Sequence, residues 1–407
     1  MNLDEKKEQL LKENLCNHCL GRQFARLGHN LQNKERGAIV RNRNTLSKKD
    51  FTRENIPVNI TDFENCDLCG GIFNQIDKYV DLVLKRIDNY EINTILIGTH
   101  VPDKIEQKEK YYRQKYGEQY SNHFKSEFNR LIGKKVQAIK DIGVNFERPD
   151  LTAIVDIKNE KINLQINSLL IYGQYNKYSR ELPQTVLFCY NCHGKGCEEC
   201  DQTGLEYSQS VQQLIQKPIL NHSGGKEAKF HGAGREDIDA RCFGKREFVV
   251  EILNPVNRNI DCDKIKKEIN TNQSKVEVFN LNFTKKEAIK QFKEKRADKT
   301  YRCLVSLSDP VETEKLKTLN KIKGAIEQRT PQRVLQNRTD KTRIRQVYQI
   351  IYEKITDTYL DLIIKAEAGT YIKELISGDK NRTQPNVSKI LQCQARCKNL
   401  DIIDIDK

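Results

Sequence analysis

Eight of the 13 cysteines stand in two compact groups, and this feature limits the possible folds more than any other. The first group joins the pair Cys16 and Cys19 to the pair Cys66 and Cys69, with residues 20–65 between them. Each C-x-x-C turn directs two thiolates toward one ion, and two such turns complete the tetrahedral ligand set that Zn²⁺ prefers. The sequence therefore predicts a structural zinc ion that closes a long loop near the N-terminus.

A second group follows in the middle of the chain, where glycines separate some of the cysteines. Glycine permits tight turns whose amide groups point toward thiolates. A redox dithiol is an alternative, but it needs only one C-x-x-C motif. Since neither group leaves an open coordination position, we expect structural zinc at the first group and a second candidate zinc site here. Its ligands would be Cys189, Cys192, Cys197 and Cys200, and the remaining five cysteines (Cys242, Cys262, Cys303, Cys393 and Cys397) are expected to be buried thiols.

The chain has 407 residues and a net charge of +14, with 70 Lys and Arg against 56 Asp and Glu. This length suggests two or three domains. The positive excess favours a polyanionic partner, because each neutralised phosphate releases counterions, although a Lys-rich proteome would produce the same excess. No apolar run reaches the roughly 20 residues that span a bilayer. The N-terminus also lacks a signal-peptide core, so we expect a cytoplasmic protein without a membrane partner.

The periodicity of apolar residues predicts an α+β fold. An N-terminal zinc-stapled α/β part precedes a mixed, mainly antiparallel sheet, which ends in a hairpin around Thr356-Asp357-Thr358. The expected division is 1–75 as a zinc-binding segment, 76–168 as an α/β domain, 169–205 as a linker with the second cysteine group, and 206–407 as the C-terminal domain. Helices are expected at 77–87, 104–116, 124–142, 209–219, 285–295 and 312–323, and strands at 92–97, 153–157, 161–166, 248–253, 277–281, 301–306, 348–354 and 359–366.

Acids, arginines and glycines are concentrated in the segment Lys229–Arg241. A reactive carboxylate needs open access to a substrate and a cation that keeps it ionised. The glycines provide the access, and Arg235 or Arg241 provides the cation. A charged surface loop with satisfied ion pairs would show the same composition.

Two further segments carry glycine next to functional side chains. Ser223-Gly224-Gly225 is similar to the phosphate loop of ATP pyrophosphatases, but no long strand precedes it, so we do not expect a nucleotide site. Gly369 permits close backbone approach, and Lys373 would face the same way as Tyr371 if the preceding strand continues. The alternative is a strand-to-helix corner with Tyr371 in the core.

Several segments, in the same order along nearly the whole chain, resemble the tRNA pseudouridine synthase family Pus10 in its archaeal form. The most specific block is His231–Asp237. The matching segments are Leu15–Phe24, Ile97–Thr99, Glu147–Asp150, Pro183–Thr185, Ser210–Val211, Phe230–Arg241 and Ala368–Glu374.

The resemblance implies roles for individual residues. Asp237 stands in the register of the family's catalytic aspartate, with Asp239 as its one close rival. Tyr301 and Tyr371 match the two positions that contact the target uridine. Lys373 stands where many relatives have arginine and is expected to pair with Asp237. Arg235 is assigned to substrate binding, and the departure Cys242-Phe243, where many relatives have Met-Leu, alters only the packing.

The implied function is an isomerase that converts uridine to pseudouridine in the TΨC loop of tRNA, at uridines 54 and 55. Residues 76–168 would form an RNA-binding THUMP domain and 206–407 the synthase domain. The chemistry needs no cofactor, so Zn²⁺ would be structural, and attack at C1′ and deprotonation at C2′ both remain open for Asp237. We expect a monomer that binds tRNA. The alternatives are a non-catalytic zinc-dependent tRNA-binding protein and a THUMP-bearing thiolase or methyltransferase, for which no ATP or S-adenosylmethionine loop is found.

Overall fold

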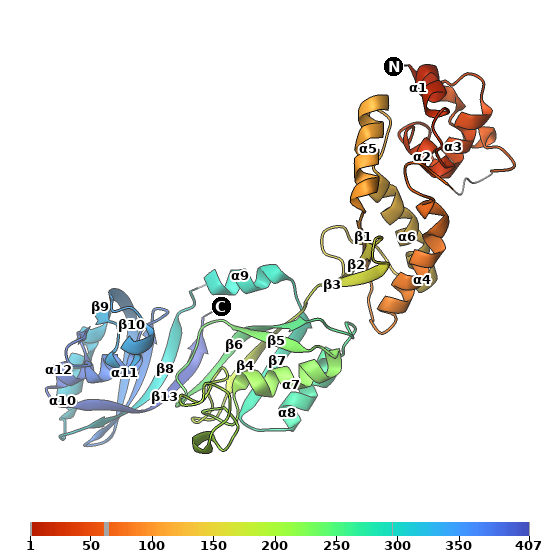
Figure 1. Cartoon of the computed structure of the whole chain (residues 1–407). Coiled ribbons are helices and arrows are strands. Elements are labelled where there is room, and N and C mark those ends of the chain that lie inside the picture. Colours follow the sequence, from red (N-terminus) through yellow and green to blue (C-terminus); the bar gives the residue numbers. More distant parts are fainter. Residues whose placement is uncertain (1, 61–64, 295, 407) are drawn as a thin grey trace. The chain divides into compact units, whose positions relative to one another are not determined.

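The computed structural model describes residues 2–60, 65–294 and 296–406. The chain forms two units, which are drawn in sequence colours in Figure 1. Unit 1 comprises Met1–Ser168 with Pro255–Arg258, and unit 2 comprises Leu169–Asn254 with Asn259–Lys407. No helix in the described ranges is long and apolar enough to cross a membrane.

Unit 1 combines helices with one small sheet. The strand order is β1-β2-β3, with β1 and β2 parallel and β2 and β3 antiparallel. Helix α4 buries Ile76, Tyr79, Val80, Val83 and Ile87, the spacing of one helical face, and α6 packs against β1. The elements are α1 (Leu3–Leu10), α2 (Asn17–Arg22), α3 (Asn33–Asn42), η1 (Lys48–Asp50), η2 (Arg53–Asn55), η3 (Ile72–Gln75), α4 (Ile76–Ile87), β1 (Ile95–His100), α5 (Asp103–Tyr116), α6 (Phe124–Lys140), β2 (Leu151–Asp156) and β3 (Lys161–Ile166).

Unit 2 is built on one ten-stranded sheet in the order β12-β9-β10-β11-β8-β13-β6-β4-β7, with β5 paired to β6. Within this sheet, the pairing of β13 with β6 is the only parallel one among the described strands. The strands are β4 (Leu169–Lys177), β5 (Glu227–Gly232), β6 (Ala240–Leu253), β7 (Val276–Phe283), β8 (Lys299–Leu307), β9 (Gly324–Arg329), β10 (Thr342–Thr356), β11 (Tyr359–Ala366), β12 (Thr383–Gln384) and β13 (Ala395–Ile405).

Helices cover the two halves of this sheet separately. Apolar residues of α7 and α8 pack on β4, β6 and β7, while those of α11, α12 and η5 pack on the half that contains β8, β10 and β11 (Figure 1). Strand β6 contributes buried residues to both cores, because its first residues pack in one and its last residues in the other. The helices are η4 (Glu198–Cys200), α7 (Val211–Ser223), α8 (Cys262–Thr271), α9 (Lys286–Glu294), α10 (Thr313–Leu316), η5 (Lys317–Ile322), η6 (Gln332–Asn337), α11 (Ile372–Ser377) and α12 (Val387–Leu391).

The α+β class and the mainly antiparallel sheet are confirmed, and several local expectations need correction. The range 169–205 begins with β4, a strand inside the large sheet, rather than with a linker. The helix expected at 312–323 is divided into α10 and η5. The strand before Gly369 does not continue to Lys373, because Gly369 has a φ of +82° and Tyr371 is the N-cap of α11. The strand-to-helix corner of the alternative is therefore observed, but Tyr371 is half-buried and is not part of the core.

Candidate active site

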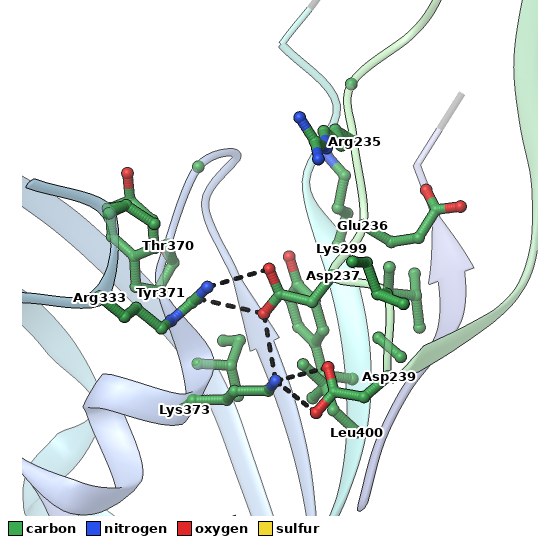
Figure 2. A pocket seen from close by; sticks show the side chains of 18 of the residues that line it. Arg235, Glu236, Asp237, Asp239, Lys299, Arg333, Thr370, Tyr371, Lys373 and Leu400 are labelled. Atoms are coloured by element: carbon green, nitrogen blue, oxygen red, sulfur yellow. Dashed lines mark hydrogen bonds and ion pairs between the residues drawn. The ribbon is translucent and has the colours of Figure 1, made fainter. Parts of the chain in front are cut away.

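A pocket of about 810 Å³ lies in unit 2 and is lined by residues of β8, β13, α11 and the loop before β6. Figure 2 shows the side chains that converge there. All five residues that the sequence assigned to catalysis or substrate binding line this one pocket: Arg235, Asp237, Tyr301, Tyr371 and Lys373.

The carboxylate of Asp237 is held by two cations. Both terminal nitrogens of Arg333 reach it, with Nη1–Oδ1 at 3.2 Å and Nη2–Oδ2 at 3.1 Å. Lys373 Nζ lies 3.4 Å from Oδ2, so the ion pair expected from the sequence is present (Figure 2). Burial alone would lower the pKa of Lys373, but its hydrogen bond to Asp239 and the charge of Asp237 outweigh this effect and raise it. Asp237 therefore faces permanent positive charge.

Asp239 differs from Asp237 in its surroundings. Both of its oxygens accept from Lys373 Nζ, at 2.6 and 2.7 Å. Its side chain is 59% exposed, whereas that of Asp237 is 32% exposed and lies deeper in the pocket. Burial raises the pKa of Asp239, but the hydrogen bond from Lys373 and the charge of Lys373 lower it by more. The pKa of Asp239 therefore lies below its ordinary value. Asp239 is therefore the outer acid and serves as a partner of Lys373.

Two tyrosines form aromatic walls of the pocket. Tyr301 lies on β8, paired with Ile364 of β11 on one side and Ile402 of β13 on the other, and is 7% exposed. Burial raises its pKa, so the phenol stays neutral. Tyr371 stands at the N-cap of α11, and its hydroxyl accepts a hydrogen bond from Arg338 Nη1 at 2.9 Å. Both rings are available to a planar base.

A buried polar network fixes the loop that carries Asp237. Glu236 and Arg246 form an ion pair of 2.8 Å between side chains that are 0% and 1% exposed. Tyr175 donates to Glu236, and Lys177 Nζ donates to the carbonyl oxygens of Asp237 at 3.1 Å and Ile238 at 2.8 Å. Burial lowers the pKa of Lys177. These contacts hold the backbone on both sides of the Asp237 side chain.

The sequence interpretation missed Arg333 as a partner of Asp237 and missed this network. Arg333 lies 96 residues away in η6, and no local sequence pattern identifies Asp237 as its partner. Arg246 could have been found, because strand alternation puts it on the buried face of β6 with Phe248 and Val250. Neither of the two arginines expected from the segment Lys229–Arg241 pairs with Asp237. Arg241 binds Asp401 instead, and Arg235 forms no ion pair within the described part of the chain.

Both cysteine groups have the geometry of a tetrahedral metal site. Their four sulfur atoms lie within 4.8 Å of one another in each group. Zn–S bonds of about 2.3 Å place neighbouring sulfurs about 3.8 Å apart in a tetrahedron. The distances are 3.7 Å for Cys16–Cys69 and 3.8 Å for both Cys189–Cys197 and Cys192–Cys200. Amide groups of glycines also donate to thiols of the second group, as predicted from its spacing. Each group can therefore hold a metal ion.

The other five cysteines divide into two kinds. Cys242 and Cys303 are buried, as expected. Cys262, Cys393 and Cys397 are partly exposed, so the expectation of buried thiols is wrong for them. Cys262 begins α8 and Cys397 lies beside an irregularity in β13, places where the packing of an element against its core is incomplete.

Two family models match the chain: "Pus10 THUMP domain, archaeal" at residues 79–156 and "Pus10, C-terminal" at residues 170–406. Curated proteins named tRNA pseudouridine synthase Pus10 match nearly full length. That of Methanocaldococcus jannaschii is 40% identical over 98% of this chain and 93% of its own. Those of Methanothermobacter marburgensis and Pyrococcus furiosus are 38% and 37% identical, over 100% of this chain and 99% and 98% of theirs.

Among solved structures, one titled as a Cbf5-Nop10-Gar1 complex matches 56% of this chain and 47% of that chain, with 16% identity and a TM-score of 0.31. The family matches reach both units, and the C-terminal one spans the whole pocket. The curated relatives carry the name of an isomerase, which decides against a purely RNA-binding protein. The chain therefore belongs to the Pus10 family of tRNA pseudouridine synthases, and it is an isomerase.

Proposed function

We propose that this chain converts uridine to pseudouridine in the TΨC loop of tRNA, at uridines 54 and 55, with Asp237 as the catalytic aspartate. One observation carries the proposal: the pocket brings together an oriented carboxylate, two cations and two aromatic rings. The reaction breaks the N1–C1′ bond, rotates the uracil and forms a C5–C1′ bond within the same nucleotide. These steps need a nucleophile or base and a surface that holds the free base.

Asp237 supplies the first requirement. Its carboxylate either forms a bond to C1′ as the uracil leaves or takes the proton from C2′, and both routes need the ionised form. Lys373 and Arg333 place two positive charges against this carboxylate. Arg333 also fixes the direction of the carboxylate through its planar fork.

Tyr301 and Tyr371 supply the second requirement. A uridine in a folded loop must be flipped out of its stack, at a cost of a few kcal/mol that stacking on an aromatic ring offsets. Tyr301 is enclosed and would hold the uracil during its rotation, while Tyr371 stands nearer the basic loop 330–342. Arg235 is exposed on the pocket wall and would contact the sugar or phosphate of the bound nucleotide.

The proposal is tested by mapping pseudouridine in tRNA transcript with carbodiimide and primer extension. Wild type, Asp237→Asn and Asp239→Asn are compared, because the two acids lie in the same pocket and both contact Lys373. We expect modification with wild type and Asp239→Asn and none with Asp237→Asn. Loss with Asp239→Asn alone would exchange the roles of the two acids. Transcripts with cytidine at position 54 or 55 show which uridine is modified, and activity elsewhere would contradict the proposed site.

We also propose that the metal in both cysteine groups is Zn²⁺ with a structural role. Four thiolates complete a tetrahedral shell, so no position remains for a substrate. Metal analysis of the purified chain should give two zinc ions per molecule. A value of one, with Cys16→Ser removing it, would restrict the metal to the first group.

A further inference from the structure

A second cavity, of about 400 Å³, adjoins the candidate active site in unit 2. It shares Gly234, Arg246, Lys299 and Gly369 with the first pocket, and is otherwise lined by different residues. Its volume lies within the roughly 300–1,000 Å³ of small-ligand sites. The isomerisation of a single uridine uses only the first pocket, so the second cavity has no role in the function proposed above.

The lining of the second cavity is strongly cationic. Its two acids already have partners: Glu247 accepts from the Tyr172 hydroxyl at 2.7 Å, and Asp406 pairs with Lys365 at 3.0 Å. The cations outnumber them even though Arg246 pairs with Glu236 and Arg345 with Glu367, two acids outside the lining. The five cations are Lys245, Arg246, Arg296, Lys299 and Arg345. The cavity therefore carries a net positive charge that residues of its own wall do not neutralise.

Three of these cations have N–H groups without an acceptor among the residues described. Arg296 is exposed and forms no ion pair or hydrogen bond there. Lys299 Nζ donates only to the Ala297 carbonyl, at 2.7 Å, and burial together with the nearby charge of Arg246 lowers its pKa. Arg246 is 1% exposed, and its Nη2 has no hydrogen-bond acceptor. A bound anion would supply the missing acceptors.

The boundary between the two cavities is formed by glycines. Gly234 and Gly369 line both cavities and have φ values of +87° and +82°. A Cβ atom at Gly234 would lie 2.8 Å from Arg246 Nη1, so a side chain there would displace the buried guanidinium. At Gly369 it would lie 3.6 Å from Arg345 Nη2. At these two shared positions no side chain therefore stands between the cavities.

We propose that the second cavity binds the nucleotide next to the uridine in the first pocket, and holds its phosphate through Arg296 and Lys299. The inference rests on the proposed function, because only a polynucleotide substrate places a second phosphate one nucleotide away. It adds to that function by specifying how the strand runs: from the pocket of Asp237, past Gly234 and Gly369, into the cationic cavity. A free nucleotide or inorganic phosphate has the same chemistry and is the competing source of the anion.

The test uses the full chain and compares Arg296→Gln with the matched control Arg396→Gln, which changes another exposed arginine of unit 2 outside both cavities. Dissociation constants for tRNA are measured by filter binding across a range of KCl concentrations. Arg296→Gln should weaken binding several-fold and reduce the slope of log K against log salt by about one. Arg396→Gln should change neither quantity. Equal effects of the two substitutions would overturn the proposal.

A coupling measurement identifies the phosphate. Substrate RNAs carry one uncharged methylphosphonate linkage on either side of the target uridine. One of these two linkages should weaken the binding of RNA to wild type but should not further weaken its binding to Arg296→Gln. The uncharged linkage and the substitution remove the same contact between phosphate and arginine. If each methylphosphonate linkage weakens binding to Arg296→Gln as much as it weakens binding to wild type, the proposal is contradicted. If neither linkage changes RNA binding, and uridine monophosphate or inorganic phosphate changes the modification rate of wild type, the cavity binds a free anion instead. These binding results do not depend on whether Asp237→Asn abolishes modification, so failure of the two proposals is distinguishable.

Discussion

At the scale of single residues, Asp237 is held by two cations of different geometry. Lys373 is a point charge that it shares with Asp239, whereas Arg333 contacts both oxygens of Asp237 and also donates from Nε to the buried Glu374 at 2.8 Å. The guanidinium of Arg333 is planar, and its Nε edge is fixed by Glu374. It therefore determines the orientation of the Asp237 carboxylate, which the point charge of Lys373 does not. Arg333 is therefore the residue that directs the carboxylate into the pocket.

Arg333→Lys should lower kcat about 10- to 100-fold while KM for tRNA changes by less than about twofold, since it removes a preorganised contact and keeps the charge. Steady-state kinetics on tRNA transcript measure both. Arg329→Lys is the control, because Arg329 belongs to the same region, pairs with Asp340 and lies outside the pocket. A raised KM with an unchanged kcat would show that Arg333 serves RNA binding alone.

Asp401 provides a test of pH dependence. Its side chain is 12% exposed and accepts from Arg180 and Arg241 at 2.6 Å each. Burial raises its pKa, but the two arginines lower it more, so the folded pKa lies below the ordinary value. Such a group stabilises the folded state above the unfolded pKa of about 3.9, and the stabilisation is lost as pH falls through the folded pKa. Urea unfolding should show Asp401→Asn less stable than wild type at pH 6, with the difference shrinking below pH 4. A constant difference across this range would contradict the assignment.

At the scale of elements, strand β6 connects the core to the loop that carries Asp237. Its alternation puts Arg246, Phe248, Val250 and Ile252 on the buried face, and Arg246 reaches Glu236 next to Asp237. The ion pair thus attaches the loop to a strand whose other inward residues are apolar. The shape of the site depends on the position of this strand in the sheet.

Arg246→Met should reduce the free energy of unfolding by about 3–5 kcal/mol, because it leaves the Glu236 carboxylate buried without its partner. Urea unfolding of the full chain measures the loss. The double variant Glu236→Gln/Arg246→Met should recover part of it, since no uncompensated charge remains. If the double variant loses the sum of both single effects, the two residues act independently and the ion pair does not anchor the loop.

At the scale of the whole molecule, each of the two units contains one cysteine group. Metal bound to the first group would connect the start of α2 to the segment before η3, and metal at the second would close the loop after β4. Because a structural metal stabilises mainly the unit that folds around it, the two groups should act separately.

Cys16→Ser should increase hydrogen exchange throughout residues 1–60, while Cys192→Ser should increase it in 185–206. Each substitution should leave the other region unchanged, and mass spectrometry of the full chain reads both in one experiment. A chelator should reproduce the sum of the two effects. Exchange that rises in both units after a single substitution would show that the units fold as one.

The sequence by itself determined the features that depend on local spacing. Cysteine spacing predicted both metal-binding groups, apolar periodicity predicted α4, the β2–β3 hairpin and the β10–β11 hairpin, and the motifs around Asp237 and Tyr371 placed both residues in one site. Only the tertiary structure decided the partners of those residues. Arg333, the Glu236–Arg246 pair and the second cavity join segments far apart in the chain, and their contacts depend on the order and register of the strands in the sheet. Local periodicity determines neither the order nor the register of the strands, because one pattern of buried and exposed residues fits many pairings of strands.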